Sequence, residues 1–180
     1  MARIVSKRHT DAHTIIDALK KYIENAKTIE GFNAATDRWL KVELIRRFLT
    51  ENHNLITTIQ DHIRIESFCD LLESFVGSSS EIGKIGGKGA GIFIAHEIIE
   101  ANKEKQPLLG DIKTPRTWYI SAEELANLIS DNELDELNEH KYKDIVEIRS
   151  TYPRIIQLFK ILRFPAHISN ALSEILDFCT

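Results

Sequence analysis

Apolar residues recur every three or four positions through much of the first half of the chain, which is the spacing of amphipathic helices. One predicted helix is capped by Thr10 or Asp11 and ends at Gly31. A second begins near Asn33 or Thr36, and two arginines in its last turn complement the helix dipole. The chain is therefore predicted to open with a helical region.

The same spacing continues through residues 55–76, where we predict a third helix. Its β-branched start leaves a short strand or a loop open before it. Residues 77–80, a glycine followed by three serines, predict a flexible connector. We place a domain boundary at this connector, with a helical N-terminal region in residues 1–80 and a second part in residues 81–180.

Beyond the connector, residues 88–102 predict a helix that is apolar on nearly all sides at its start, so it should be well buried. Residues 118–120 give the best strand signal, and Ser121 with Glu124 forms a capping box that opens another helix. A partner strand is indicated only weakly, for example at residues 111–114.

The last part of the chain predicts two more helices after an acidic, irregular segment at residues 131–140. Asp144 caps the first of them, and Pro153 should start or kink the following turn. Pro165 fits the first residue of the last helix. The predicted fold class is α+β and predominantly helical, with few strands.

Composition excludes several classes of protein. Of the 180 residues, 43% are hydrophobic and 28% are charged, which is ordinary for a globular protein. The net charge of −4 argues against a nucleic-acid partner. No apolar run reaches the roughly 18–20 residues of a membrane span, and the N-terminus lacks the apolar core of a signal peptide, so we expect no membrane partner and a cytoplasmic protein.

The two cysteines, Cys69 and Cys179, form no disulfide framework and no CxxC site, so we expect reduced packing residues. Trp39 and Trp118 are predicted to be core residues rather than ligand platforms.

The histidines do not predict a metal centre. His9 and His13 share a helical spacing but lack a third ligand. The segment that begins with His96 resembles a zinc-protease motif, but Glu100 stands where the second histidine is needed. No pattern of nucleophile and base indicates catalytic residues, so the catalytic residues stay unknown and no metal site is predicted.

The segment of residues 83–91 holds five of the eight glycines and leads directly into a predicted helix. The N–H groups at a helix N-terminus suit a phosphate, and Lys88 adds a full charge. The segment is no P-loop, since Ile82 stands at its first glycine position, and Ile92 breaks the dinucleotide fingerprint. From the residues alone, an anion site and a mobile loop with a capping turn both stay open. Lys84 is expected to be solvated.

A resemblance favours the anion site. Residues 85–91, followed by an apolar helix, look like the nucleotide loop of the PEP/pyruvate-binding domain of phosphoenolpyruvate synthase and pyruvate, phosphate dikinase. Residues 115–121 resemble that family's proline, strand and helix-opening serine or threonine. Segments 141–145, 152–153 and 164–165 resemble short motifs between the helices of a bacterial subgroup of this family. The similarity therefore covers about residues 82–178.

This resemblance implies that Gly86, Gly87, Lys88 and Gly89 contact the phosphates of ATP. It also implies an ATP-grasp-like domain and an enzyme that moves a phosphoryl group from ATP, through a histidine, to pyruvate, with Mg²⁺ as a further cofactor. The family's Val-Arg-Ser-Ser segment and its magnesium-binding carboxylates are not found in the sequence. We therefore expect the front part of a phosphotransferase that is inactive alone and whose partner is the remainder of the enzyme or a partner domain.

Two alternatives stay open. The chain can be a non-catalytic helical interaction module that keeps the fold, or an unrelated helical protein with a fortuitous glycine loop.

Overall fold

The structure is a computed structural model that describes residues 2–7, 10–28, 34–77 and 82–179. Its contacts divide the chain into two units, residues 1–123 and residues 124–180. The boundary that the sequence predicts at residue 80 lies among residues 78–81, outside the described ranges, and stays a prediction. The predicted end of the first helix at Gly31 also lies outside them.

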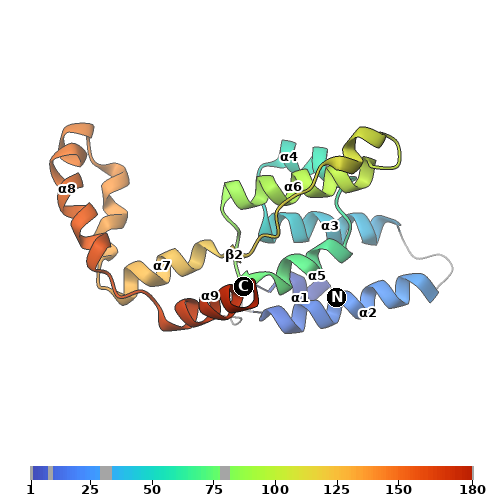
Figure 1. Ribbon diagram of the computed structural model, residues 1–180, viewed down its shortest axis with the longest axis horizontal. Helices are drawn as coiled ribbons and strands as arrows, with labels where there is room; N and C mark the ends of the chain where they lie inside the picture. The colour runs from blue at the N-terminus through green and yellow to red at the C-terminus, as the bar shows by residue number, and fades with distance from the viewer. Residues whose placement is uncertain (1, 8–9, 29–33, 78–81, 180) are drawn as a thin grey trace. The chain divides into compact units, whose positions relative to one another are not determined.

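In its described residues, the first unit begins with the helices α1 (Ala2–Val5), α2 (Ala12–Thr28), α3 (Ala34–Phe48), α4 (His53–Ile59) and α5 (Glu66–Glu73) (Figure 1). The predicted cap of α2 is confirmed, because Asp11 Oδ1 accepts a hydrogen bond from the Thr14 backbone N–H at 2.9 Å. The Thr14 hydroxyl also donates to Asp11 Oδ2 at 2.7 Å, and these two hydrogen bonds, the hydroxyl one first, lower the pKa of Asp11. Helix α2 packs against α1 and α5, and α3 packs against α1 and α4.

The same unit continues with strand β1 (Phe75–Val76), helix α6 (Gly87–Asn102), the 3₁₀ helix η1 (Pro107–Asp111) and strand β2 (Tyr119–Ile120). Strands β1 and β2 pair in parallel, with Phe75 opposite Tyr119 and Val76 opposite Ile120. The sheet is short, and the predicted fold class, a predominantly helical α+β protein, is confirmed.

A chain of aromatic rings joins these elements in one core. The Phe68 ring of α5 lies 6.5 Å from Phe48 of α3 and 5.7 Å from Phe93 of α6, measured between centroids. Phe75 of β1 continues the chain to Tyr119 of β2 at 6.3 Å. The N-terminal helices and helix α6 therefore share one hydrophobic core.

Four predictions for this unit are wrong. Residues 55–76 do not form one helix, because the chain turns after Ile59 and the alternation of buried Ile63 and Ile65 around exposed Arg64 interrupts the helical spacing. The partner of β2 is β1 rather than residues 111–114.

The other two concern burial. Helix α6 buries Ala90, Phe93 and Glu97 but leaves Ile92 and Ile98 exposed, so it is less buried than expected. Trp39 is also exposed rather than a core residue, and Trp118 is half-buried with the Arg116 guanidinium 4.7 Å from its ring.

Helix α7 (Ala122–Asp131) begins directly after Ser121, as predicted, at the end of the first unit. The second unit continues with the 3₁₀ helix η2 (Asp135–Tyr142), α8 (Ile145–Ile161) and α9 (Ala166–Cys179). Asp144 caps α8 by accepting from the N–H groups of Val146 and Glu147 at 2.7 and 3.0 Å, as predicted. Pro153, predicted to start or kink a turn, lies inside α8, and Pro165 directly precedes α9.

None of the helices in the described ranges combines the length and the apolar character needed to cross a membrane.

Candidate functional site

The segment that leads into the glycines is held by backbone hydrogen bonds on two sides. Ile85 N–H donates to the Phe48 carbonyl at the end of α3, at 2.9 Å. The Lys84 carbonyl accepts from Ala122 N–H at 2.9 Å, and Ile85 bridges Ser121 in antiparallel fashion. The main chain therefore fixes where the glycine segment begins.

Helix α6 begins immediately after this anchored segment. Gly86 is its N-cap residue, with an extended backbone (φ −61°, ψ 157°), and no side chain caps the helix. Its first bond runs from Ala90 N–H to the Gly86 carbonyl at 2.9 Å. The N–H groups of Gly87, Lys88 and Gly89 precede that bond, so they have no acceptor within the helix and can serve an anion.

The glycines of this segment fall into two groups. At Gly89 an added Cβ would lie 3.2 Å from the Tyr119 ring, so this glycine allows α6 to pack against β2. At Gly86, Gly87 and Gly91 an added Cβ would meet nothing within 4 Å. The packing of the fold therefore does not require glycine at these three positions.

Lys88 lies in the first turn of α6 and is exposed. Within the described part of the chain no ion pair engages it. No acidic residue lies in the same turn, so the positive end of the helix and the lysine charge add together there. Lys84, expected to be solvated, instead forms an ion pair with Glu51 and is half-buried.

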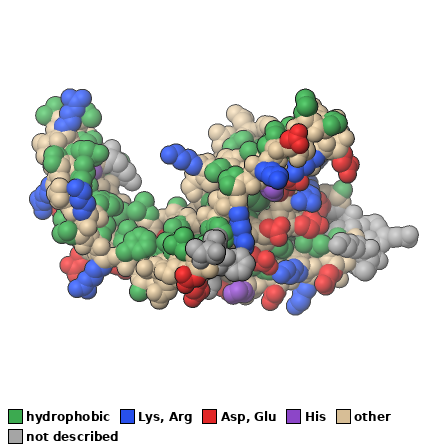
Figure 2. Space-filling model, in the orientation of Figure 1, with side chains coloured by type: hydrophobic (Ala, Val, Ile, Leu, Met, Phe, Trp, Pro, Cys, Tyr) green, Lys and Arg blue, Asp and Glu red, His purple; other side chains and the backbone are tan. Residues whose placement is uncertain are grey.

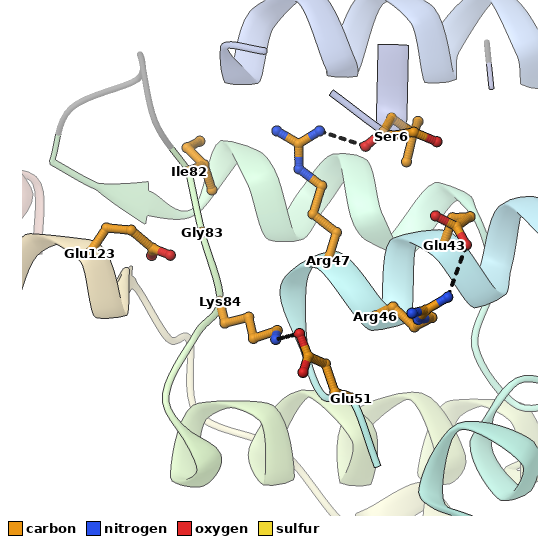
Figure 3. A pocket seen from close by; sticks show the side chains of 10 residues that line it. Ser6, Glu43, Arg46, Arg47, Glu51, Ile82, Gly83, Lys84 and Glu123 are labelled. Carbon is orange, nitrogen blue, oxygen red and sulfur yellow. Dashed lines mark hydrogen bonds and ion pairs between the residues drawn. The ribbon is translucent and has the colours of Figure 1, made fainter. Parts of the chain in front are cut away.

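A cavity of about 480 Å³ lies beside the start of this segment (Figure 3). Gly83 and Lys84 line it together with Arg46 and Arg47 of α3 and Glu123 of α7. The four predicted site residues, Gly86, Gly87, Lys88 and Gly89, are not among its lining residues. Sequence reasoning missed this cavity, because its walls come from distant segments and no local motif links them.

His96 and Glu97, further along α6, have structural partners. His96 Nδ1 lies 2.6 Å from the Thr114 hydroxyl. The buried Glu97 carboxylate accepts a hydrogen bond from the buried Ser67 hydroxyl and lies 3.8 Å from Arg64 Nε. Among the residues that the structure describes, no cluster of three or more His, Cys, Asp or Glu side chains could hold a metal ion.

Comparison with known proteins identifies the part of the chain that carries the glycine segment. Residues 82–180 match the family described as pyruvate phosphate dikinase, AMP/ATP-binding domain, which is more than half of the chain. No curated protein and no solved structure matches. The match begins one residue before Gly83 and includes α6, β2 and all of residues 124–180. The chain therefore belongs to the pyruvate phosphate dikinase AMP/ATP-binding domain family.

Proposed function

We propose that Gly86, Gly87, Lys88 and Gly89 bind the phosphates of ATP. The observation that carries this proposal is the open space at Gly86 and Gly87. Glycine inside a helix destabilises it by roughly 0.5–1 kcal/mol relative to alanine. At the start of the helix, where the N–H groups have no acceptor within the helix, such a glycine supports a ligand that approaches the backbone closely.

The chemistry of the site fits a polyphosphate. The N–H groups of Gly87, Lys88 and Gly89 point out of the helix end, where the helix dipole favours negative charge. The Lys88 ammonium supplies a further charge-assisted hydrogen bond to a phosphate oxygen. Membership of an AMP/ATP-binding family supports a nucleotide as the source of that phosphate.

In the intact enzyme, ATP bound here would donate a phosphoryl group through a histidine to pyruvate, as in phosphoenolpyruvate synthase-like phosphotransferases. Phosphoryl transfer depends chiefly on positioning and charge neutralisation. In the described residues the site offers positioning and one lysine, but no carboxylate in the first turn of α6. We therefore propose that protein ligands for Mg²⁺ come from the remainder of the enzyme or a partner domain, and that this chain is inactive alone.

The test is a titration of the full chain with Mg²⁺-ATP, followed by ¹H–¹⁵N NMR. This method detects weak binding and shows which residues respond. We expect the largest shift changes at the amides of Gly86, Gly87, Lys88 and Gly89. Lys88→Ala should weaken binding about tenfold or more, because it removes a hydrogen bond from a charged group.

Gly87→Ala and Gly91→Ala form a matched pair, because neither added methyl group meets another atom in the fold. Gly91→Ala should stabilise the fold by roughly 0.5–1 kcal/mol and leave ATP binding unchanged. Gly87→Ala should weaken ATP binding, since its methyl group enters the space proposed for the phosphates. Equal ATP binding by wild type, Gly87→Ala and Lys88→Ala would contradict the proposal.

The second candidate is a non-catalytic helical interaction module. It is favoured by the apolar side chains exposed in residues 124–180, such as Ile145, Val146 and Ile161. The same titration separates the two functions, because a module of this kind would give no shift changes at the glycine segment.

A further inference from the structure

The cavity beside the glycine segment has walls from two parts of the first unit. Arg46, Arg47 and Glu51 come from the N-terminal region, whereas Gly83, Lys84 and Glu123 come from the segment that matches the family. Figure 3 shows these side chains around one space, with Glu123 directed toward Gly83. Its volume of about 480 Å³ lies in the range of small-molecule sites.

Glu123 is the unusual group in this cavity. Its Oε2 atom is buried and has no hydrogen-bond partner. The carboxylate packs directly against the backbone of Gly83, where an added Cβ would lie 1.8 Å from the Glu123 carboxyl carbon. A buried carboxylate oxygen without a partner is costly, so this position calls for a hydrogen-bond donor, ideally one with a positive charge.

The three cationic side chains of the cavity differ in how firmly other groups of the protein hold them. Arg47 is fixed by the carbonyls of Val5 and Lys7, to which its guanidinium donates at 2.6 and 2.8 Å. Lys84 pairs with Glu51, whose side chain is 72% exposed. The Arg46 guanidinium lies 3.5 Å from Glu43 Oε1, and the Arg46 side chain is 58% exposed. Exposed pairs contribute little stability, so Lys84 and Arg46 can exchange these partners for a bound anion.

The formal charges of the lining residues balance, with Arg46, Arg47 and Lys84 against Glu43, Glu51 and Glu123. A neutral ligand with separated charges suits such a lining better than a polyphosphate or a polyamine. We propose that this cavity binds a small zwitterion of the α-amino-acid type, with its ammonium group at Glu123 and its carboxylate at Lys84 and Arg46. The site is distinct from the one proposed for ATP, because none of Gly86, Gly87, Lys88 and Gly89 lines it.

The test uses the full chain and the protein α-amino acids, added one at a time. Thermal unfolding screens them, and calorimetry then measures the affinity of those that stabilise the protein. Methylamine and acetate serve as half-ligands that carry one charged group each. We expect at least one amino acid to bind at least tenfold more tightly than either half-ligand. Failure of every amino acid to bind, or equal affinity for a half-ligand, would overturn the proposal.

Two variants place the ligand in the cavity. Glu123→Gln keeps the shape and removes the charge that the ammonium group needs, and Lys84→Gln removes the partner of the carboxylate. Each should lower the affinity at least tenfold, while the exposed control Glu104→Gln should bind like wild type. Unchanged binding by Glu123→Gln would refute the site. If that variant does not fold, unchanged binding by Lys84→Gln has the same meaning.

The outcome does not depend on ATP. Lys88→Ala should still bind the amino acid, so failure of the nucleotide proposal and failure of this proposal are distinguishable.

Discussion

Residues 1–123 and residues 124–180 show the same helical periodicity but bury their apolar side chains very differently. In the described part of the first unit, Phe48, Phe68, Leu44, Ile45 and many others are almost completely buried. In the described part of the second, Ile168 is the single hydrophobic residue that is almost completely buried. A helical repeat of apolar residues thus predicts the helix, but it does not predict what covers its apolar face.

The second unit relies instead on polar contacts at the ends of its helices. Asn132, just after α7, accepts a hydrogen bond from Arg163 N–H at 3.0 Å and donates one to the Arg163 carbonyl at 3.3 Å. His167 of α9 lies 3.1 Å from the buried carboxylate of Glu124. Figure 2 shows hydrophobic side chains on the surface of α8. The large hydrophobic residues exposed on this unit are Leu125, Tyr142, Ile145, Val146, Tyr152, Phe159, Ile161, Phe164 and Leu176.

The strongest way to break this comparison is to truncate one phenylalanine in each unit. Phe68→Ala removes a fully buried ring between Phe48 and Phe93, so it should lower the free energy of unfolding by about 3–5 kcal/mol. Phe159→Ala, at a side chain that is 42% exposed, should cost less than about 1 kcal/mol. Urea unfolding, followed by circular dichroism and by tryptophan fluorescence, measures both. Equal losses would show that Phe159 is buried in solution.

Cys69 offers a second test, through pH. Burial raises the pKa of its thiol to about 11, from a reference value of 9.0. Between these values the unfolded chain loses the thiol proton and the folded chain keeps it. The free energy of unfolding should therefore fall as the pH rises from about 9 to about 11, by on the order of 2 kcal/mol.

Urea unfolding across this pH range measures the effect, and Cys69→Ala is the control that should lack the Cys69 share of the loss. A thiol-labelling reagent gives a second readout in a Cys179→Ser background. Labelling of Cys69 should be slow until the first unit unfolds. Fast labelling under native conditions would contradict its burial.

The smallest effect is expected from removing the caps of two helices, one in each unit. Asp144→Ala removes both hydrogen bonds that cap α8 and should cost about 1 kcal/mol. Because α8 buries none of its described side chains, this loss should appear locally, as a roughly fivefold drop in hydrogen-exchange protection of its first turns. Asp11→Ala removes the equivalent cap of α2, whose Ile15 and Leu19 are buried, so the rest of α2 should stay protected. Equal fraying of both helices would contradict the contrast.

Local signals in the sequence predicted the helix starts, because caps act within one turn. Asp11, Asp144 and Ser121 precede helices at the predicted places, and the strand at Tyr119 follows from its aromatic and β-branched neighbours. The pairing of β1 with β2 joins residues 44 positions apart in a parallel arrangement, for example Phe75 and Tyr119. No local pattern encodes such a pairing, since it depends on how the intervening elements fold.

In the candidate site, too, features that are local in the sequence were predictable and features that depend on the fold were not. The cluster of glycines at the start of α6 and the lysine in its first turn were predictable, because these residues are contiguous in the sequence. The sequence could not distinguish Gly89, where an added Cβ would meet the Tyr119 ring, from Gly87, where an added Cβ would meet nothing within 4 Å. The cavity around Glu123 could not be predicted either, since Arg46 and Glu51 approach it from distant parts of the sequence.

The backbone anchors of the glycine segment have a consequence for how its sequence can change over evolution. Ile85 is tied by its N–H group, and the next fixed point is the Ala90 N–H bond to Gly86. Main-chain bonds of this kind are indifferent to most side chains but sensitive to the number of residues between them. One residue inserted within the first turn of α6, before Lys88, would turn that lysine about 100° around the helix axis. Descendants of this chain should therefore exchange residues in the segment far more readily than they gain or lose one.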